Sequence, residues 1–425
     1  MRRLPLTDAL PYKFYPPKVS PFWVWAGRAY VRHLLRTRNR VYDVEFTGLE
    51  HVTPLLTRGD GVLVTPNHTD DADCQVVFDL ARRVGRPFCY MAAYQIFTGL
   101  NHGFLSRVGA FPVDREGSDL AAFRAAVGVL ARGRYPLVVF PEGETYHQAD
   151  RLTPLREGAA VLAATAAKTH ARAGRTVWIV PAALKYRFLD GHDPLPALET
   201  LMGELEARYA WRPRPERSLV ERIYRYGEGT LGLLELDFLG APRSGPLPER
   251  LEALRAHILG EMEGRRLGRQ SRTEPAPVRV KGLRHACLEA LADPATVPDE
   301  AVRLRRDLDD LFVVLQLFSY PGDYVRECPT LERVAETLTK LEEDALGNQG
   351  ARPRGPRRAL LRLGPPIDVG AHLAAAGGKA RKVGPSLTAE LETRMQGLLD
   401  AIGPGRPLPA PPTAEPQRRS APATA

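Results

Sequence analysis

The stretch GVLVTPNHTDDAD, residues 61–73, contains a strand-to-helix junction typical of an α/β fold. Residues 61–66 are mostly apolar and include the β-branched Val62, Val64 and Thr65, which predicts a buried strand, and the acidic segment that follows predicts the first turn of a helix. His68 and Asp73 lie at this junction. In open α/β sheets such a junction lies at the carboxyl edge, where binding sites form. A histidine there can accept a proton if a carboxylate fixes its tautomer.

The His-x4-Asp spacing alone leaves other interpretations open. Asp70, Asp71 and Asp73 could cap the helix and complement its dipole. Together with His68 they could instead hold a divalent cation, as in a metal-dependent hydrolase. The ten histidines are scattered without an HxH or HxxxH pair, and the sequences GxSxG and GxxxxGK are absent. We therefore expect no metal site and keep the hydrolase as an alternative, together with a non-enzymatic binding protein.

The sequence around this stretch alternates strands with helices and predicts an α/β layer fold with a mainly parallel or mixed sheet. From about residue 196 to 346 the apolar residues follow a helical period, which predicts an all-helical unit. Strand-like residues return at 359–369, before a final helix at 387–402. The other expected strands are 41–46, 87–93, 109–114, 135–140 and 176–184, and the other expected helices are 22–38, 70–83, 118–132 and 158–171.

Three further segments place polar residues after expected strands. FPEGETY (140–146) contains a Pro-Glu-Gly turn that lets backbone N–H groups approach a ligand. GAFPVDR (109–115) ends in Arg115, and IVPAALKY (179–186) runs through a proline to Lys185. Each segment alone is more typical of an ordinary turn or surface residue.

In their order along the chain, the four segments resemble the four motif blocks of the PlsC-like glycerolipid acyltransferases. The resemblance covers residues 67–186 and extends loosely to LRLGPPIDV near residue 365. It implies an α/β fold: a PlsC-like acyltransferase sheet with flanking helices, an inserted all-helical unit and an N-terminal amphipathic helix. It also implies transfer of a fatty acyl group from acyl-CoA or acyl-carrier protein to a glycerolipid hydroxyl, without a cofactor.

The resemblance assigns roles to residues that match the family motifs. His68 would be the general base and Asp73 would orient it, and no acyl-enzyme is expected. Arg115 would bind the phosphate of the acceptor, which is lysophosphatidic acid-like. The expected substrate-binding residues are Asn67, Arg115, Glu142, Gly143, Pro181 and Lys185, with Glu142 and Gly143 shaping the acceptor site and Pro181 beside the acyl chain.

One motif departs from the family. The family commonly reads FPEGTRS, whereas this chain has Glu144 and Thr145 after Gly143. A phosphate-binding cation is thereby lost and an anion gained, which leaves a non-phosphorylated acceptor as an alternative. Lys185 or Arg187 could supply the missing cation.

The net charge of +9 is unevenly distributed. Residues 9–42 and residues 348–385 each contribute +7, so the rest of the chain is net acidic. On a helical wheel of residues 22–38, an arginine stripe opposes an apolar stripe, which fits a helix on an anionic lipid surface but, taken alone, fits an ordinary packed helix better. The lipid substrate that the resemblance implies favours the membrane surface. The apolar stripe contains Trp23, Ala26, Tyr30 and Leu34, and the arginines are Arg28, Arg32 and Arg36.

Four dispersed cysteines and the lack of a signal-peptide core predict a cytoplasmic protein, peripheral on the inner face of a membrane. The basic stretches lack a nucleic-acid-binding motif, so no nucleic-acid partner is expected. The expected organisation is a membrane-contact segment at 1–40, a catalytic domain at 41–190, a helical insertion at 191–350, a return to the catalytic domain at 351–402, and a disordered Pro/Ala-rich tail at 403–425.

Overall fold

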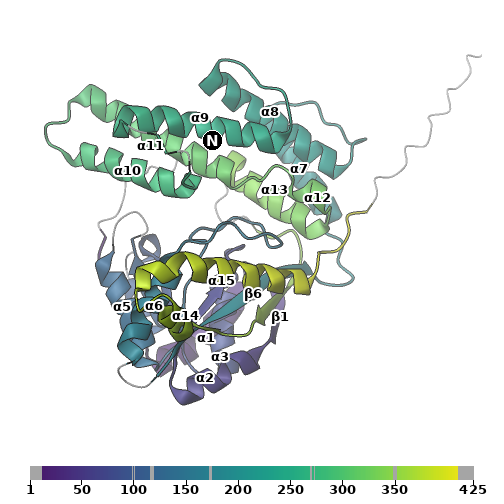
Figure 1. The fold of residues 1–425 in the computed structure, drawn as a ribbon. Coiled ribbons are helices and arrows are strands. Elements are labelled where there is room, and N and C mark those ends of the chain that lie inside the picture. The colour runs from purple at the N-terminus through teal and green to yellow at the C-terminus, as the bar shows by residue number, and fades with distance from the viewer. Residues whose placement is uncertain are drawn as a thin grey trace, which may run out of the picture.

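The computed structural model describes residues 12–409, apart from residues 98, 100, 115–118, 172–174, 269, 272 and 348–351. It has an α/β part and a helical part stacked on it (Figure 1). Among the described residues, no helix is both long and apolar enough to cross a membrane.

The α/β part is built on an eight-stranded mixed sheet. Along the main path the strand order is β1-β7-β6-β2-β5-β3-β4, and β8 pairs with β6. The strands β6, β2, β5, β3 and β4 are parallel, whereas β7 is antiparallel to β6 and parallel to β1. The strands are β1 (Val41–Thr47), β2 (Gly61–Pro66), β3 (Cys89–Ala93), β4 (Ala110–Val113), β5 (Leu137–Val138), β6 (Val177–Phe188), β7 (Arg357–Leu363) and β8 (Ile367–Asp368).

Helices cover both faces of the sheet, because alternate strand residues point to opposite sides. Val62 and Val64 pack toward α1 (Pro21–Thr37), α2 (Thr53–Arg58) and α3 (Asp73–Val84). Leu63 packs toward α5 (Leu120–Arg132), α6 (Gly158–Ala171) and α15 (Ala380–Ile402). The short elements are η1 (Leu49–His51), η2 (Tyr94–Ile96), α4 (Asn101–Arg107) and α14 (Val369–Ala375).

The helical part is inserted between β6 and β7, which are neighbours in the sheet. A loop at this point can therefore carry an extra unit without breaking the sheet. Two apolar clusters form its core, one around α7, α8 and α13, the other around α9, α10 and α11. Its helices are α7 (Leu195–Arg208), α8 (Leu219–Leu239), α9 (Leu247–Leu267), α10 (Ala276–Ala292), α11 (Pro298–Phe318), α12 (Tyr324–Glu327) and α13 (Leu331–Leu346).

The chain after α15 differs from the sequence expectation. Residues 403–409 were assigned to a disordered tail, but they run beside the helical part. The Leu331 N–H donates to the Arg406 carbonyl at 2.8 Å, and the Leu408 N–H donates to the Pro329 carbonyl at 2.9 Å. The composition of this segment is tail-like, but these backbone bonds depend on a distant partner. Residues 410–425 lie outside the described part of the chain.

The N-terminal helix α1 packs on α3 and α4 through a narrower face than the wheel suggested. Val24, Gly27 and Leu35 are its buried residues. Trp23 and Tyr30, which belong to the expected apolar stripe, are exposed. One face of the helix therefore packs on the α/β part, while aromatic side chains on the rest of the helix are exposed to solvent.

Candidate active site

His68 and Asp73 meet at the carboxyl end of β2. His68 follows that strand by two residues, and Asp73 is the first residue of α3. The His68 Nδ1 and Asp73 Oδ2 atoms are 2.8 Å apart. The Asp73 side chain is fully buried, whereas that of His68 is 21% exposed. The imidazole thus has one side held by the protein and part of its surface accessible.

Three further donors fix the Asp73 carboxylate. The backbone N–H groups of Thr69 and Asp70 donate to Oδ2 at 2.6 and 2.9 Å, and the Tyr186 hydroxyl donates to Oδ1 at 2.7 Å. Burial beside this carboxylate raises the pKa of Tyr186 well above its usual value, so the phenol stays a donor. A carboxylate can only accept, so His68 Nδ1 carries the proton in this pair. Its Nε2 is left to accept a proton.

The Nε2 side of His68 faces the FPEGETY segment. Thr145 Oγ1 lies 3.1 Å from His68 Nε2, and the Phe140 ring packs 4.4 Å from the imidazole, centroid to centroid. Hydroxyl, imidazole and carboxylate are thus aligned as in the general-base arrangement of hydrolytic triads. The Thr145 oxygen marks where a second hydroxyl group can reach the base.

Glu142 holds the backbone of His68 in place through a hydrogen bond. Its carboxylate accepts the His68 N–H at 2.7 Å and the Thr153 N–H at 3.1 Å, and it also accepts the Thr153 hydroxyl. Burial raises the pKa of Glu142 to about 7, although these hydrogen bonds act in the opposite direction. The residue was expected to shape an acceptor site. Here its described contacts join the FPEG turn to the strand end that carries His68.

The FPEG turn also requires its glycine. Gly143 has a φ of 81°, a left-handed conformation that residues with a side chain rarely adopt. A Cβ atom at this position would lie 2.5 Å from Nε of Arg156. The half-buried Arg156 side chain therefore lies against the turn, and its guanidinium makes no ion pair with any residue that the structure describes. Sequence reasoning missed this cation because it belongs to none of the motif segments.

Two residues expected to bind substrate instead form hydrogen bonds or an ion pair within the protein. The Asn67 side chain donates to the Leu184 carbonyl at 3.0 Å and accepts the Leu184 N–H at 2.6 Å, so it joins β2 to β6. Lys185 is 2% exposed, forms an ion pair with Asp150 and donates to the Gly403 carbonyl at 3.0 Å. In this arrangement both side chains have partners within the protein, so the structure gives no support to their assignment as substrate-binding residues.

The remaining expected residues lie elsewhere. Arg187, the second cation considered as compensation, donates to the Gly403 carbonyl. Pro181 is buried in the centre of β6 and packs near Gly364 and Leu398, on the opposite face from Tyr186. Arg115 lies outside the described residues, so its role stays a prediction.

The carboxylates next to the dyad have separate partners. Arg357 binds Asp70 at 2.7 Å; although burial acts in the opposite direction, this guanidinium holds the pKa of Asp70 below its usual value. Asp71 lies 3.6 Å from Arg38. Asp73 serves His68, so the three carboxylates do not converge on one point. The metal-dependent hydrolase alternative gains no support from this geometry.

The helical part holds the segment that follows the FPEGET turn. His147 binds Glu343 of α13 at 3.1 Å, and the Gln148 side chain donates to the Ser319 carbonyl at 2.8 Å. Asp150 pairs with Arg333 at 2.7 Å, and Arg151 pairs with Asp323 at 2.7 Å. These contacts span up to 196 residues of sequence. The inserted unit therefore supports one side of the candidate site.

Comparison with known protein families agrees with the motif geometry. Residues 43–185 match the family model described as Acyltransferase. Residues 43–185 therefore form a region of the PlsC-like acyltransferase type, which supports an enzyme that transfers acyl groups. The matched range includes His68, Asp73 and the FPEG turn. No curated protein matches the sequence significantly.

Proposed function

We propose that this protein transfers a fatty acyl group from an acyl thioester to a hydroxyl of a phosphorylated glycerolipid, with lysophosphatidic acid as the model acceptor. The observation that supports this reaction is the dyad: Asp73 holds Nδ1 of His68 at 2.8 Å, and Nε2 faces a hydroxyl at 3.1 Å. Such an imidazole is arranged to remove a proton from an alcohol.

The reaction proceeds in a single transfer between bound substrates. His68 Nε2 takes the acceptor's hydroxyl proton as its oxygen attacks the thioester carbonyl carbon. The tetrahedral intermediate collapses, the C–S bond breaks, and the imidazolium returns the proton to the thiolate. Asp73 stabilises the transient imidazolium by charge and keeps the ring oriented. The acceptor hydroxyl takes the position next to Nε2 that Thr145 marks, so no ester on the protein is needed.

Arg156 supplies the phosphate-binding cation that the FPEGETY sequence lacks. Its guanidinium lies against Gly143, two residues from Thr145, and a planar guanidinium suits a phosphate oxygen pair. Arg115 is the second cation proposed for this role. Lys185 and Arg187 are already engaged by the fold, which leaves Arg156 as the favoured replacement.

Arg156→Ala is expected to raise KM for lysophosphatidic acid by about tenfold or more, because a charge-assisted contact is worth about 1.5–3 kcal/mol. KM for an unphosphorylated monoacylglycerol should change little. Steady-state assays with both acceptors and labelled acyl-CoA measure this, with the exposed Arg124→Ala of α5 as the matched control. Equal losses for both acceptors would contradict phosphate recognition by Arg156.

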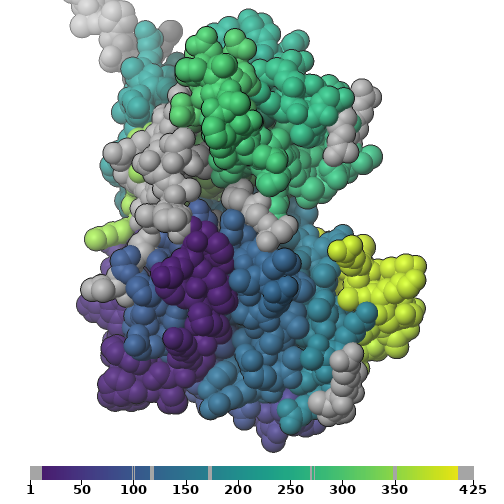
Figure 2. Space-filling view, turned by 90° about the vertical axis from the view of Figure 1, so that its left-hand side faces the viewer, coloured from purple at the N-terminus to yellow at the C-terminus, as the bar shows by residue number. Residues whose placement is uncertain are grey.

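The exposed aromatic face of α1 supports a peripheral position on the inner face of a membrane. Phe22, Trp25 and Tyr30 are 64%, 66% and 55% exposed, and the N-terminal segment lies on the outside of the α/β part (Figure 2). Arg32 and Arg36 are also exposed on this helix. Exposed rings beside arginines suit an interface with anionic headgroups. The second basic stretch is weaker support, because Arg354, Arg357 and Arg358 form ion pairs with carboxylates.

Replacing both Phe22 and Trp25 with serine is expected to lower binding to vesicles containing anionic phospholipid by about tenfold or more, since two large apolar side chains leave the interface. Flotation of the protein with such vesicles measures the bound fraction. The matched control is Val297→Ser with Val302→Ser, which changes two exposed apolar residues of the helical part. Unchanged flotation of the α1 variant would remove this helix from the membrane contact.

A further inference from the structure

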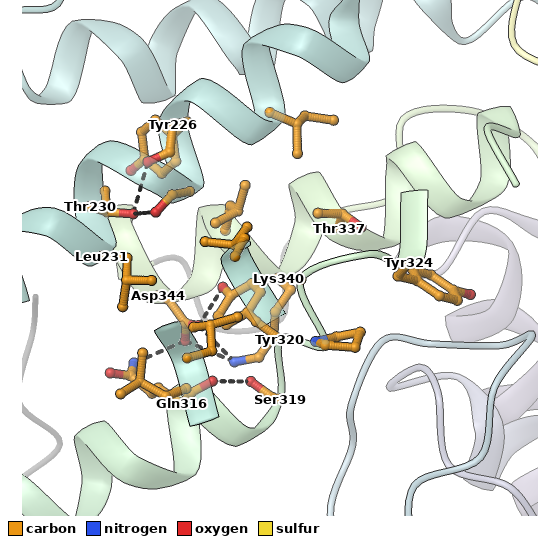
Figure 3. Close-up of a pocket in the computed structure, with 18 of the residues that line it drawn as sticks. Tyr226, Thr230, Leu231, Gln316, Ser319, Tyr320, Tyr324, Thr337, Lys340 and Asp344 are labelled. Carbon is orange, nitrogen blue, oxygen red and sulfur yellow. Dashed lines mark hydrogen bonds and ion pairs between the residues drawn. The ribbon is translucent and has the colours of Figure 1, made fainter. Parts of the chain in front are cut away.

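The helical part contains a largely apolar, partly open cavity of about 220 Å³. It lies between α8, α9, α11 and α13 and is closed on one side by residues 319–325 (Figure 3). Its apolar lining includes Ile223, Leu231, Leu234, Leu251, Val313 and Leu317. One water-sized group needs about 10–15 Å³ by the same measure, so the cavity has room for on the order of fifteen such groups.

The cavity and the candidate active site lie on either side of one short segment of the chain. Tyr146, His147 and Gln148 line it, and they follow Thr145 directly. The Tyr146 N–H donates to the His68 carbonyl at 3.3 Å, while its ring packs edge-on against Phe318 at 6.0 Å between centroids. The backbone of Tyr146 thus contacts the backbone of His68, and its side chain contacts the cavity.

The charged groups in the lining are neutralised within the fold. Asp344 binds Lys340 at 2.9 Å and accepts hydrogen bonds from Tyr320 at 2.7 Å and Gln316 at 3.0 Å (Figure 3). The other charged lining residues, His147 and Asp323, pair with Glu343 and Arg151. The described lining therefore offers no unpaired charge to a ligand. An elongated apolar group suits this cavity better than an anion or a sugar.

We infer that this cavity binds the fatty acyl chain during transfer, with the carbonyl end of the chain toward His68 and the methyl end among α8, α11 and α13. The inference rests on the proposed function, which supplies the acyl substrate. It gives the inserted helical unit a direct part in selecting the length of the acyl chain. The chain can belong to the thioester donor or to the acceptor lipid, and separate assays distinguish the two.

Filling the cavity tests the inference. Thr337 of α13 lines it with a small side chain, so Thr337→Phe places a ring in the space. Val313→Phe fills the same cavity from α11 and serves as a second variant if the first fails to fold. Thr200→Phe, at an exposed threonine of α7, is the matched control.

Each variant is assayed with 16-carbon and 8-carbon acyl-CoA donors at a fixed acceptor, and then with 16-carbon and 8-carbon lysophosphatidic acids at a fixed donor. We expect either filling variant to lower the 16-carbon to 8-carbon ratio of kcat/KM by about tenfold or more in one series, because several methylenes lose their buried site. The affected series identifies the substrate whose chain occupies the cavity. An unchanged ratio in both series, with a folded variant, overturns the inference.

A binding measurement separates this inference from the reaction itself. A non-hydrolysable 16-carbon thioether of CoA and a 16-carbon lysophosphatidic acid are titrated by calorimetry into His68→Ala protein, with and without Thr337→Phe. Tenfold weaker binding of one of them in the filled protein supports the acyl site even if no acceptor is turned over. Equal binding of both ligands overturns the acyl site even if acyl transfer by wild-type protein is confirmed.

Discussion

Replacing His68 with alanine is expected to lower kcat/KM for acyl transfer by at least about a thousandfold. A general base contributes about 10²–10⁴ in rate, and here the same imidazole must also return the proton to the leaving thiol. The variant lacks the only nitrogen that faces Thr145 Oγ1 at 3.1 Å among the described residues. Release of thiol and formation of labelled ester are measured together.

The fold is expected to survive this substitution. The His68 N–H to Glu142 bond belongs to the backbone and persists in the variant, as do the three other donors to Asp73. His372 is a matched control, because it also pairs with a carboxylate, Glu390 at 2.8 Å, but lies on α14. His372→Ala should keep wild-type activity. Equal activity of His68→Ala and His372→Ala, with both proteins folded, would contradict the proposed base.

Asp73→Asn is expected to lower kcat by about 10³–10⁴, as loss of the orienting carboxylate does in serine-protease triads. Asparagine keeps the shape but has one acceptor oxygen, whereas Asp73 serves His68, Thr69, Asp70 and Tyr186. Its amide group would turn the imidazole to the wrong tautomer or leave one of these donors unpaired. The acceptor's KM should change much less than kcat.

Asp60→Asn is the matched control for that prediction. Asp60 is also a buried carboxylate, and it accepts hydrogen bonds from Arg58 and Trp178 at the opposite end of β2. Its replacement should lower thermal stability without a comparable loss of kcat. If Asp60→Asn and Asp73→Asn lose kcat equally, the effect at Asp73 is one of general destabilisation rather than orientation of the base.

The sequence predicted the contact between His68 and Asp73 because the two residues are close together along the chain. His68 and Asp73 are five residues apart, and one strand-to-helix turn brings them together. Tyr186, which completes the carboxylate site, lies 113 residues from Asp73 and follows a lysine that points the other way. The only sequence signal for it was strand alternation along β6, which places Tyr186 on the face of β6 that packs toward α3.

The contacts of Asn67 and Lys185 could not be predicted, for a common physical reason. Asn67 follows β2 directly, and the sequence placed Lys185 just after an expected strand at 176–184, although it lies within β6; strand ends are the usual position of ligand-binding side chains. Whether such a group contacts substrate or other parts of the protein depends on partners 117 and 35 residues away, the Leu184 carbonyl and the Asp150 carboxylate, which a motif does not reveal. The helical insertion was predictable from periodicity and from the return of strand character near residue 359. Its contacts with residues 147–151 and its cavity were not, because they depend on how the two parts dock.

Direct acyl transfer from the thioester to the acceptor hydroxyl is tested by measuring thiol release and ester formation in one reaction. Wild-type protein is mixed with labelled acyl-CoA or acyl-carrier protein, with lysophosphatidic acid, glycerol 3-phosphate, an unphosphorylated lysolipid or no acceptor. We expect thiol to be released only with an acceptor, in a one-to-one ratio with labelled ester, and we expect lysophosphatidic acid to be preferred. Thiol release without acceptor, with labelled free fatty acid or labelled protein as the product, would contradict this expectation.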